Sequence, residues 1–290
     1  MPWRDAGAHP NSVQALKYRH KQLKRAATTL DGTRIGVVRG YARRKKVLDV
    51  GCVSHDFSFA SGGGGNWLHD HVRKAAAECV GVDYDEAGIR QMREAGYDVV
   101  HADITGDLTP ILERGPFDVV VAGEVIEHLP TPQALLAMAR EALRPGGRLV
   151  ITTPNPYSPR RQRTGALGIT WENADHIVYA FPSGMAEMAD RTGLVLEKFG
   201  TVGWPYPQPL WKELWESGKA LVEAVRKRAE GQGNQLAVGR VRLPLPLTWQ
   251  SPLDILITRL RGRRGMLRET SIYVLRRPAD RPARPDTEGS

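Results

Sequence analysis

Residues 47–52 read VLDVGC, a short apolar run that contains one carboxylate and ends at small residues. Two lysines precede it, and the pattern is typical of a parallel strand that is buried on both faces. Gly51 has no Cβ, so it permits a sharp turn and lets a ligand lie directly against the backbone. A strand followed by such a turn is typical of the first half of a nucleotide-binding βαβ unit.

Two later runs also end in acids, at residues 79–83 (CVGVD) and 99–103 (VVHAD). Valine-rich strands that end in a small or acidic residue are common, so each run alone is weak support for a nucleotide site. The spacing of the three favours successive parallel strands, because their carboxyl ends then meet at one edge of a sheet. Asp83 is then placed to accept hydrogen bonds from ribose hydroxyls, and Asp103 to face an adenine.

Five motifs in this order resemble those of the class I S-adenosylmethionine-dependent methyltransferases, and especially the ubiquinone-biosynthesis O-methyltransferases. They are residues 47–52, 81–83, 102–104, 117–129 (FDVVVAGEVIEHL) and 143–151 (LRPGGRLVI). The resemblance covers roughly Ile35 to Phe199, together with a last strand near 271–275. It implies an α/β, Rossmann-like, doubly wound fold with a seven-stranded sheet. That sheet is expected to be mostly parallel with an antiparallel last strand, and to carry helices on both faces.

The resemblance also implies S-adenosylmethionine as the cofactor. The residues implied to bind it are Asp49, Gly51, Cys52, Asp83, Tyr84, Asp103, Ile104 and Glu124. The chain departs from the family pattern where two more glycines usually follow the first, because Val53 and His55 stand there. A glycine run, SGGGGN at 61–66, comes later, so we expect a lengthened first loop.

Two histidines are candidate catalytic residues. Methyl transfer from a sulfonium is a displacement in which the protein aligns the acceptor and, for a hydroxyl, removes its proton. Glu124 closes the predicted fourth strand, and His128 lies at the same edge if the following turn is helical. His128 is therefore a candidate general base, and the alternative is a histidine that packs the turn before Pro130. His176, after the fifth strand, is the second candidate, because that region usually lines an acceptor pocket in the family.

Metal ligands and nucleophiles are not indicated by the sequence. Asp56 and Asp70 lie near His69 and His71, but the two histidines are two positions apart on a predicted helix and so face apart. Cys52 is predicted to be buried, as is the other cysteine of the chain, which indicates a reduced protein without disulfides. No serine lies in a nucleophile-elbow pattern.

Composition indicates a globular protein with basic flanks. The 290 residues are 41% hydrophobic and 25% charged, and no apolar run reaches the ~18 residues that span a bilayer. We therefore expect a cytoplasmic protein. Residues 1–46 carry 12 Lys and Arg against two acids, residues 47–155 carry eight against 16, and residues 156–290 carry 21 against 14. An acidic core with basic flanks favours a polyanionic partner, although charge runs are most often solvated faces.

The pattern of elements predicts five segments along the chain. They are a basic N-terminal helical arm (1–32), the core (33–199), a Trp- and Arg-rich insert (200–269), a last core strand (270–277) and a disordered tail (278–290). Predicted helices lie at 13–30, 35–41, 67–77, 85–95, 132–143, 183–192 and 209–230, and further strands at 119–122, 149–153, 194–199 and 271–275. The insert, with four of the seven tryptophans, is expected to be a lid over the site or a membrane-surface element.

The expected activity is O-methylation of a small-molecule, lipid-linked or glycan-type acceptor, with peripheral membrane contact through residues 200–269. An RNA or protein methyltransferase that uses the basic flanks is an alternative, although the Asn/Asp-Pro-Pro-aromatic signature of many amino-methylating enzymes is missing after the fourth strand. Nucleic acid is therefore the less favoured partner. A non-catalytic nucleotide-cofactor-binding protein also stays open. A NAD-dependent dehydrogenase would need the glycine triplet that Val53 and His55 interrupt.

Overall fold

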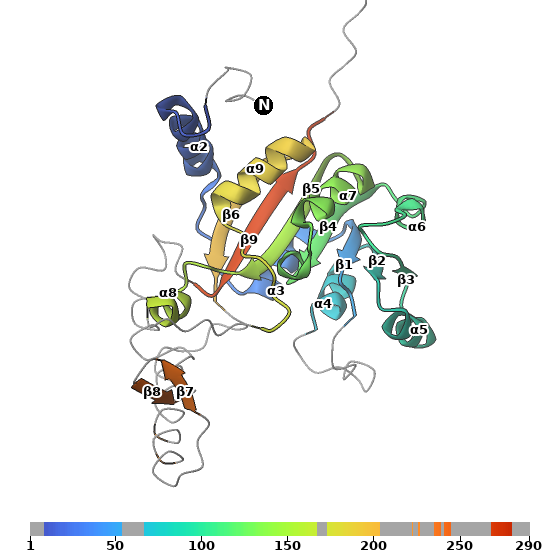
Figure 1. Ribbon diagram of the computed structural model, residues 1–290. Coiled ribbons are helices and arrows are strands. Elements are labelled where there is room, and N and C mark those ends of the chain that lie inside the picture. The colour runs from blue at the N-terminus through green and yellow to red at the C-terminus, as the bar shows by residue number, and fades with distance from the viewer. Residues whose placement is uncertain are drawn as a thin grey trace, which may run out of the picture.

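The computed structural model describes residues 9–53, 67–166, 173–203, 235–238, 241–244 and 268–279, together with Val222 and Arg226. Within this part of the chain lies a seven-stranded sheet in the order β3-β2-β1-β4-β5-β9-β6 (Figure 1). Its strands are β1 (Lys46–Val50), β2 (Glu78–Asp83), β3 (Val99–His101), β4 (Phe117–Gly123), β5 (Leu143–Pro154), β6 (Val195–Val202) and β9 (Thr270–Arg276). Strands β1 to β5 pair in parallel, and β9 runs antiparallel to both β5 and β6. The predicted Rossmann-like fold is confirmed.

Helices cover both faces of this sheet, because successive strand residues alternate between two apolar cores. Leu48 and Val50 pack with α7 and α9, whereas Val47 packs with α3 and α4 on the other face. The helices are α2 (Val13–Ala26), α3 (Arg34–Ala42), α4 (Leu68–Ala75), α5 (Glu86–Glu94), α6 (Thr109–Leu112), α7 (Pro132–Ala142), α8 (Pro159–Ala166) and α9 (Pro182–Thr192), with a 3-10 turn η2 (Ile126–His128). Each fully buried Val or Leu side chain contributes about 1.5–3 kcal/mol, so this two-sided burial dominates the stability of the sheet.

Local sequence signals set several helix ends. The Ser12 side chain caps α2 and the Asp85 side chain caps α5, each by accepting a hydrogen bond from a backbone N–H of the first turn. The prediction that the first helix reaches residue 30 is wrong, because α2 ends at Ala26. Residues 27–33, which we call the strap, run along the edge strand β6 instead, with bridges at both ends. Cys79 is half-buried rather than buried.

Four elements were not predicted from the sequence. They are the helices α6 and α8 and the strands β7 (Gln235–Val238) and β8 (Val241–Pro244), which form a hairpin. The hairpin lies within the predicted insert, where an amphipathic helix was expected over 209–230. Of that helix only Val222 and Arg226 are described, both helical. The predicted start of the insert at residue 200 is wrong, because β6 continues to Val202. Residues 204–234, apart from Val222 and Arg226, together with 239–240, 245–267 and most of the predicted tail, lie outside the described residues.

The carboxyl ends of the parallel strands meet at one edge of the sheet, which we call the carboxyl edge. Val50 pairs with both Val82 and Ala122, so β1, β2 and β4 end together. Val202 and Thr270 pair with each other at the same edge, where β6 ends and β9 begins. The chain between these two residues therefore departs from the carboxyl edge and returns to it. Among the described helices, none is both long and apolar enough to cross a bilayer.

Candidate functional site

The turn after β1 has the close-packed geometry that the sequence predicts. Gly51 has a φ of +72°, and its N–H donates to the Val82 carbonyl oxygen at 2.9 Å. A Cβ at this position would lie 2.5 Å from Cγ2 of Val125, which belongs to the turn after β4. A side chain is therefore excluded at Gly51 both by its backbone conformation and by its neighbour, and the ends of β1 and β4 can approach closely.

Asp83 ends β2 with its carboxylate fixed by the backbone. Its Oδ2 accepts a hydrogen bond from the Val53 N–H at 3.0 Å, and its Oδ1 accepts one from the Asp85 N–H at 3.1 Å. Burial raises the pKa of Asp83, and the two N–H groups oppose that rise. A carboxylate has about four lone-pair sites, so it can accept from more than these two donors. Asp83 is thus oriented and retains the capacity to bind a diol.

Two of the other implied cofactor residues are turned into the interior. Oδ2 of Asp49 lies 2.8 Å from Nδ1 of His69 on α4, and both side chains are buried. The Cys52 thiol is also buried, which raises its pKa and excludes a thiolate nucleophile. The backbone of Cys52 still contributes to the edge, because its carbonyl oxygen accepts a hydrogen bond from the Trp67 indole at 2.9 Å.

The predicted adenine side lies at the ends of β2 and β3. Tyr84 is exposed and Ile104 is half-buried against the core. The Asp103 carboxylate is exposed, and its Oδ1 accepts from the backbone N–H and the hydroxyl of Thr105, each at 2.8 Å. These hydrogen bonds lower the pKa of Asp103, so it is ionised at neutral pH.

Glu124, at the end of β4, has a left-handed backbone that is uncommon for a residue with a side chain. Its φ is +59°, and its N–H donates to the Thr152 carbonyl oxygen at 2.9 Å. The Thr152 hydroxyl donates to Oε1 of Glu124 at 2.9 Å, and Nη1 of Arg34 lies 3.8 Å from the same oxygen. Burial raises the pKa of Glu124, while the Arg34 guanidinium acts in the opposite direction. Arg34, from the start of α3, was not predicted to be part of the site.

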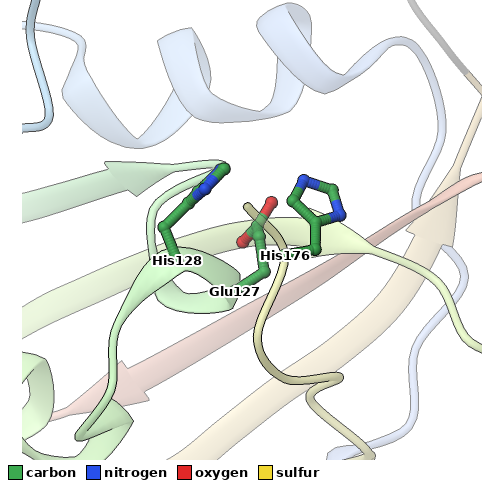
Figure 2. A group of neighbouring side chains, drawn as sticks. All are labelled: Glu127, His128 and His176. Carbon is green, nitrogen blue, oxygen red and sulfur yellow. The ribbon is translucent and has the colours of Figure 1, made fainter. Parts of the chain in front are cut away.

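The two candidate catalytic histidines lie together beside a buried glutamate. Figure 2 shows Glu127, His128 and His176, whose potential ligand atoms lie within 4.8 Å of one another. The rings of His128 and His176 meet edge to face, with centroids 4.8 Å apart. Nδ1 of His128 lies 3.0 Å from Oδ2 of Asp175. The Ile177 N–H donates to the Glu127 carbonyl oxygen at 2.8 Å, which fixes the segment before α9 against η2.

This group can move a proton or hold a cation. A carboxylate and two imidazoles form a ligand set that suits divalent transition metals. The residues weighed as ligands from the sequence are not gathered in this way. His69 pairs with Asp49, the Asp70 carboxylate binds Lys74 at 2.6 Å, and Asp56 lies outside the described residues. The sequence analysis did not identify Glu127 or Asp175 as part of the site. For Asp175 the reason is that nothing in the sequence places residue 175 beside residue 128.

Glu127 should make the stability of the protein depend on pH. Its carboxyl is fully buried and accepts one hydrogen bond, from the Thr153 hydroxyl to Oε2 at 2.9 Å. Burial, with a smaller contribution from Glu124, raises the pKa of Glu127 to about 8. The folded state therefore binds this proton more tightly than the unfolded state. The resulting stabilisation is complete below pH ~4.3, the usual pKa of glutamate, and is lost as the pH rises toward 8.

We expect Glu127→Gln to flatten that dependence, because glutamine keeps the acceptor for Thr153 and cannot ionise. The measurement is the free energy of unfolding of wild type and of the variant, in urea, between pH 5 and 9. As the pH rises over this range, the difference between the two free energies should shift by a few kcal/mol in favour of the variant. Thr153→Val leaves the Glu127 carboxyl in place, so its free energy of unfolding should still fall as the pH rises, as in the wild type. Parallel curves for wild type and Glu127→Gln would contradict the assignment.

Comparison with known proteins identifies the family. A family model described as a methyltransferase domain matches residues 18–198. The ubiquinone biosynthesis O-methyltransferase of Idiomarina loihiensis is 31% identical over 144 residues, which are 48% of this chain and 52% of that protein. The same enzyme of Methylococcus capsulatus is 26% identical over 191 residues, which are 64% of this chain and 68% of that protein.

A crystal structure of a SAM-dependent methyltransferase from Archaeoglobus fulgidus is similar at 15% identity and a TM-score of 0.46, covering 83% of this chain and 94% of that one. The chain spans about half the length of the Idiomarina relative. The family model, in contrast, covers more than half of this chain, and its match includes β1 to β5 and every described residue of the site. The chain belongs to the methyltransferase domain family.

Proposed function

We propose that this chain transfers the methyl group of S-adenosylmethionine to a hydroxyl group of an acceptor, with His128 as the general base. The observation that carries the proposal is the contact between Nδ1 of His128 and the Asp175 carboxylate, at the carboxyl edge beside the turns that hold Gly51 and Asp83. The relatives are ubiquinone biosynthesis O-methyltransferases, which supports transfer to oxygen.

The residues of the carboxyl edge fit the cofactor that the family implies. The fixed Asp83 carboxylate would accept hydrogen bonds from the ribose hydroxyls, and the Gly51 turn leaves backbone without a side chain. Arg34 and Glu124 place one cation and one carboxyl group near each other, which suits the carboxylate and ammonium of the methionine half. The cofactor would supply a methyl group already activated on a sulfonium.

The acceptor side would be organised by the His128–Asp175 pair. The Asp175 carboxylate favours the tautomer that carries its proton on Nδ1 of His128, because it accepts the hydrogen bond from that nitrogen. Nε2 then carries the lone pair and would take the proton from the acceptor hydroxyl as the methyl group bonds to the oxygen and leaves the sulfonium. His176, in edge contact with His128, would line the acceptor pocket.

The acceptor class is proposed to be a small molecule, free or linked to a lipid or glycan. Exposed apolar side chains surround the acceptor side of the carboxyl edge. Ile177 follows His176 directly, and the Tyr157 and Phe181 rings meet edge to face with centroids 5.5 Å apart. An acceptor with an apolar portion would cover this surface. This supports a lipid-linked acceptor over a purely polar one.

Peripheral membrane contact through residues 200–269 is proposed as the route by which such an acceptor arrives. The segment combines tryptophans with clustered Lys and Arg, which favour the interface and anionic headgroups. We expect the full chain to co-sediment with anionic vesicles at low salt and to be released as salt rises, because attraction is screened within ~10 Å at 0.1 M. A variant in which a short turn replaces residues 204–267 should stay in the supernatant. Equal sedimentation of that variant would assign the contact to the basic arm instead.

The proposed function is tested by supplying the chain with methyl-labelled S-adenosylmethionine and a cell extract, and by identifying the labelled product. A product labelled on oxygen supports the proposal, and the product then names the acceptor. Label on a nitrogen of RNA or protein would overturn the acceptor class. If the chain binds the cofactor but no fraction of the extract becomes labelled, a non-catalytic binding protein is favoured.

A further inference from the structure

Bridges join the two ends of the strap to β6 and to the residue that follows it. Bridges pair Ala27 with Phe199 and Thr33 with Gly203 in the parallel sense, and the Thr28 N–H donates to the Phe199 carbonyl oxygen at 2.9 Å. The strap thus extends the sheet by one short edge segment. It ends where α3 begins, at the carboxyl edge.

Gly200 is the residue of β6 that lets the strap lie so close. A Cβ at Gly200 would stand 2.5 Å from the Thr28 carbonyl oxygen and 3.0 Å from Cγ of Leu30. The first of these contacts is with backbone, which cannot move aside as the end of a flexible side chain can. Any side chain at position 200 would therefore displace the strap from β6.

The other end of the strap is tied down through α2. Nη2 of Arg19 lies 2.5 Å from Oε2 of Glu187, and its Nη1 lies 3.3 Å from Oδ2 of Asp190, both on α9. Nε2 of Gln22 donates to Oδ1 of Asp190 at 3.1 Å. The three charged side chains are only 16%, 22% and 12% exposed, so solvent screens this contact less than a surface ion pair.

Arg34 follows the strap directly, and its side chain lies in the candidate site. The Thr33 side chain caps α3 by accepting a hydrogen bond from the Gly36 N–H at 3.0 Å, and Arg34 is the first residue of that helix. The buried guanidinium reaches Oγ1 of Thr152 at 3.5 Å and lies 3.8 Å from Oε1 of Glu124. The pairing of a guanidinium with a carboxylate is directional. A buried guanidinium therefore binds a carboxylate well only if the backbone that carries it is held in a fixed position.

We propose that α2 and the strap act as a positioning device for Arg34, with Arg19 and Gly200 as positioning residues for cofactor binding. The inference rests on the proposed function, in which Arg34 meets the amino-acid end of the cofactor. Neither Arg19 nor Gly200 touches the site. Each acts by keeping the strap on β6, so that α3 starts where the Arg34 guanidinium faces Glu124 and Thr152.

Calorimetric titration of the full chain with S-adenosylmethionine tests the device. We expect Gly200→Ala and Arg19→Ala to raise the Kd about tenfold each, which corresponds to about 1.4 kcal/mol. Arg19→Lys should recover part of the loss, because it keeps the charge opposite Glu187 and Asp190. Lys17→Ala is the matched control, since it removes one positive charge from the exposed face of α2 and should leave the Kd unchanged. Unchanged Kd in both positioning variants would overturn the proposal, even if their melting temperatures fell.

A double-mutant cycle identifies Arg34 as the residue through which the device acts. In an Arg34→Ala background, Gly200→Ala should weaken binding no further, because the contact to be positioned is already gone. Full additivity of the two losses would overturn the proposal. Hydrogen exchange without cofactor gives an independent reading, in which the first amides of α3 should exchange faster in Gly200→Ala. Unchanged exchange would overturn the device, whereas a wild type that binds no S-adenosylmethionine would overturn the proposed function.

Discussion

His128→Ala should lower the single-turnover rate of methyl transfer by about 10²-fold or more, the usual size of a general-base contribution. The reason is that Nδ1 of His128 contacts Asp175 and that Nε2 is the atom proposed to accept the proton. The Kd for S-adenosylmethionine should stay close to the wild-type value, because the cofactor contacts are proposed to come from other residues. Rates with the labelled acceptor and calorimetric titration with the cofactor measure the two effects separately.

Asp175→Asn is the matched variant, because it keeps a hydrogen-bond acceptor at the same place and removes the charge. Its rate should fall less than that of His128→Ala, because the imidazole that takes the proton is still present. A His128→Ala protein with the wild-type rate and a lowered melting temperature would leave His128 with a packing role. Loss of activity in chelator that a divalent transition metal such as Mn²⁺ or Zn²⁺ restores would make Glu127, His128 and His176 metal ligands instead.

Asp83→Ala should weaken S-adenosylmethionine binding by ~1.5–3 kcal/mol, the cost of removing a charged hydrogen-bond partner. The carboxylate is already oriented by the Val53 and Asp85 N–H groups, so little order has to be gained when the ribose binds. Calorimetric titration of wild type and variant measures this difference. An unchanged Kd would show that the ribose lies elsewhere, and wild-type preference for NAD would contradict the cofactor assignment.

Because alanine at position 83 also removes the acceptor of two backbone N–H groups, the loss of affinity has to be separated from a loss of stability. Asp85→Ala serves this purpose. It removes the N-cap of α5, whose Oδ1 accepts from the Ala87 N–H at 3.0 Å, and should cost about 1 kcal/mol of stability. Its Kd for the cofactor should stay near that of wild type. Equal losses of affinity in both variants would attribute the effect of Asp83→Ala to the loop.

The core of the fold was predictable because each buried strand carries its signal locally. Residues 47–52 and 117–123 are apolar runs that end in turns, and their alternate side chains fill the two faces of the sheet. The end of α2 was not predictable in this way. Leu30 continues the helical spacing, but the strap follows β6 because Gly200, remote in sequence, allows the close approach. Tertiary pairing here overrides the local periodicity.

The site was predictable where one strand end supplies it and not where distant segments meet. Gly51 and Asp83 are read from single motifs, and the turn that holds His128 is indeed helical. Asp175 meets His128 where the segment before α9 hydrogen-bonds to the Glu127 carbonyl, a contact between residues remote in sequence. Arg34 offered one weak signal, a charged residue within a short apolar helix, since a buried arginine requires a partner.

The direct pairing of Val202 with Thr270 has a practical consequence for engineering. The two ends of the intervening polypeptide are neighbours on adjacent antiparallel strands, so a hairpin turn could join them without stretching the sheet. The entropy of closing a longer connection grows only with the logarithm of its length. The position is therefore a grafting point, where foreign modules whose own termini lie close together can be exchanged at low cost to the scaffold. Because this position opens onto the carboxyl edge, a library of such grafts would vary the surface beside the candidate site while the residues proposed to bind the cofactor stay constant.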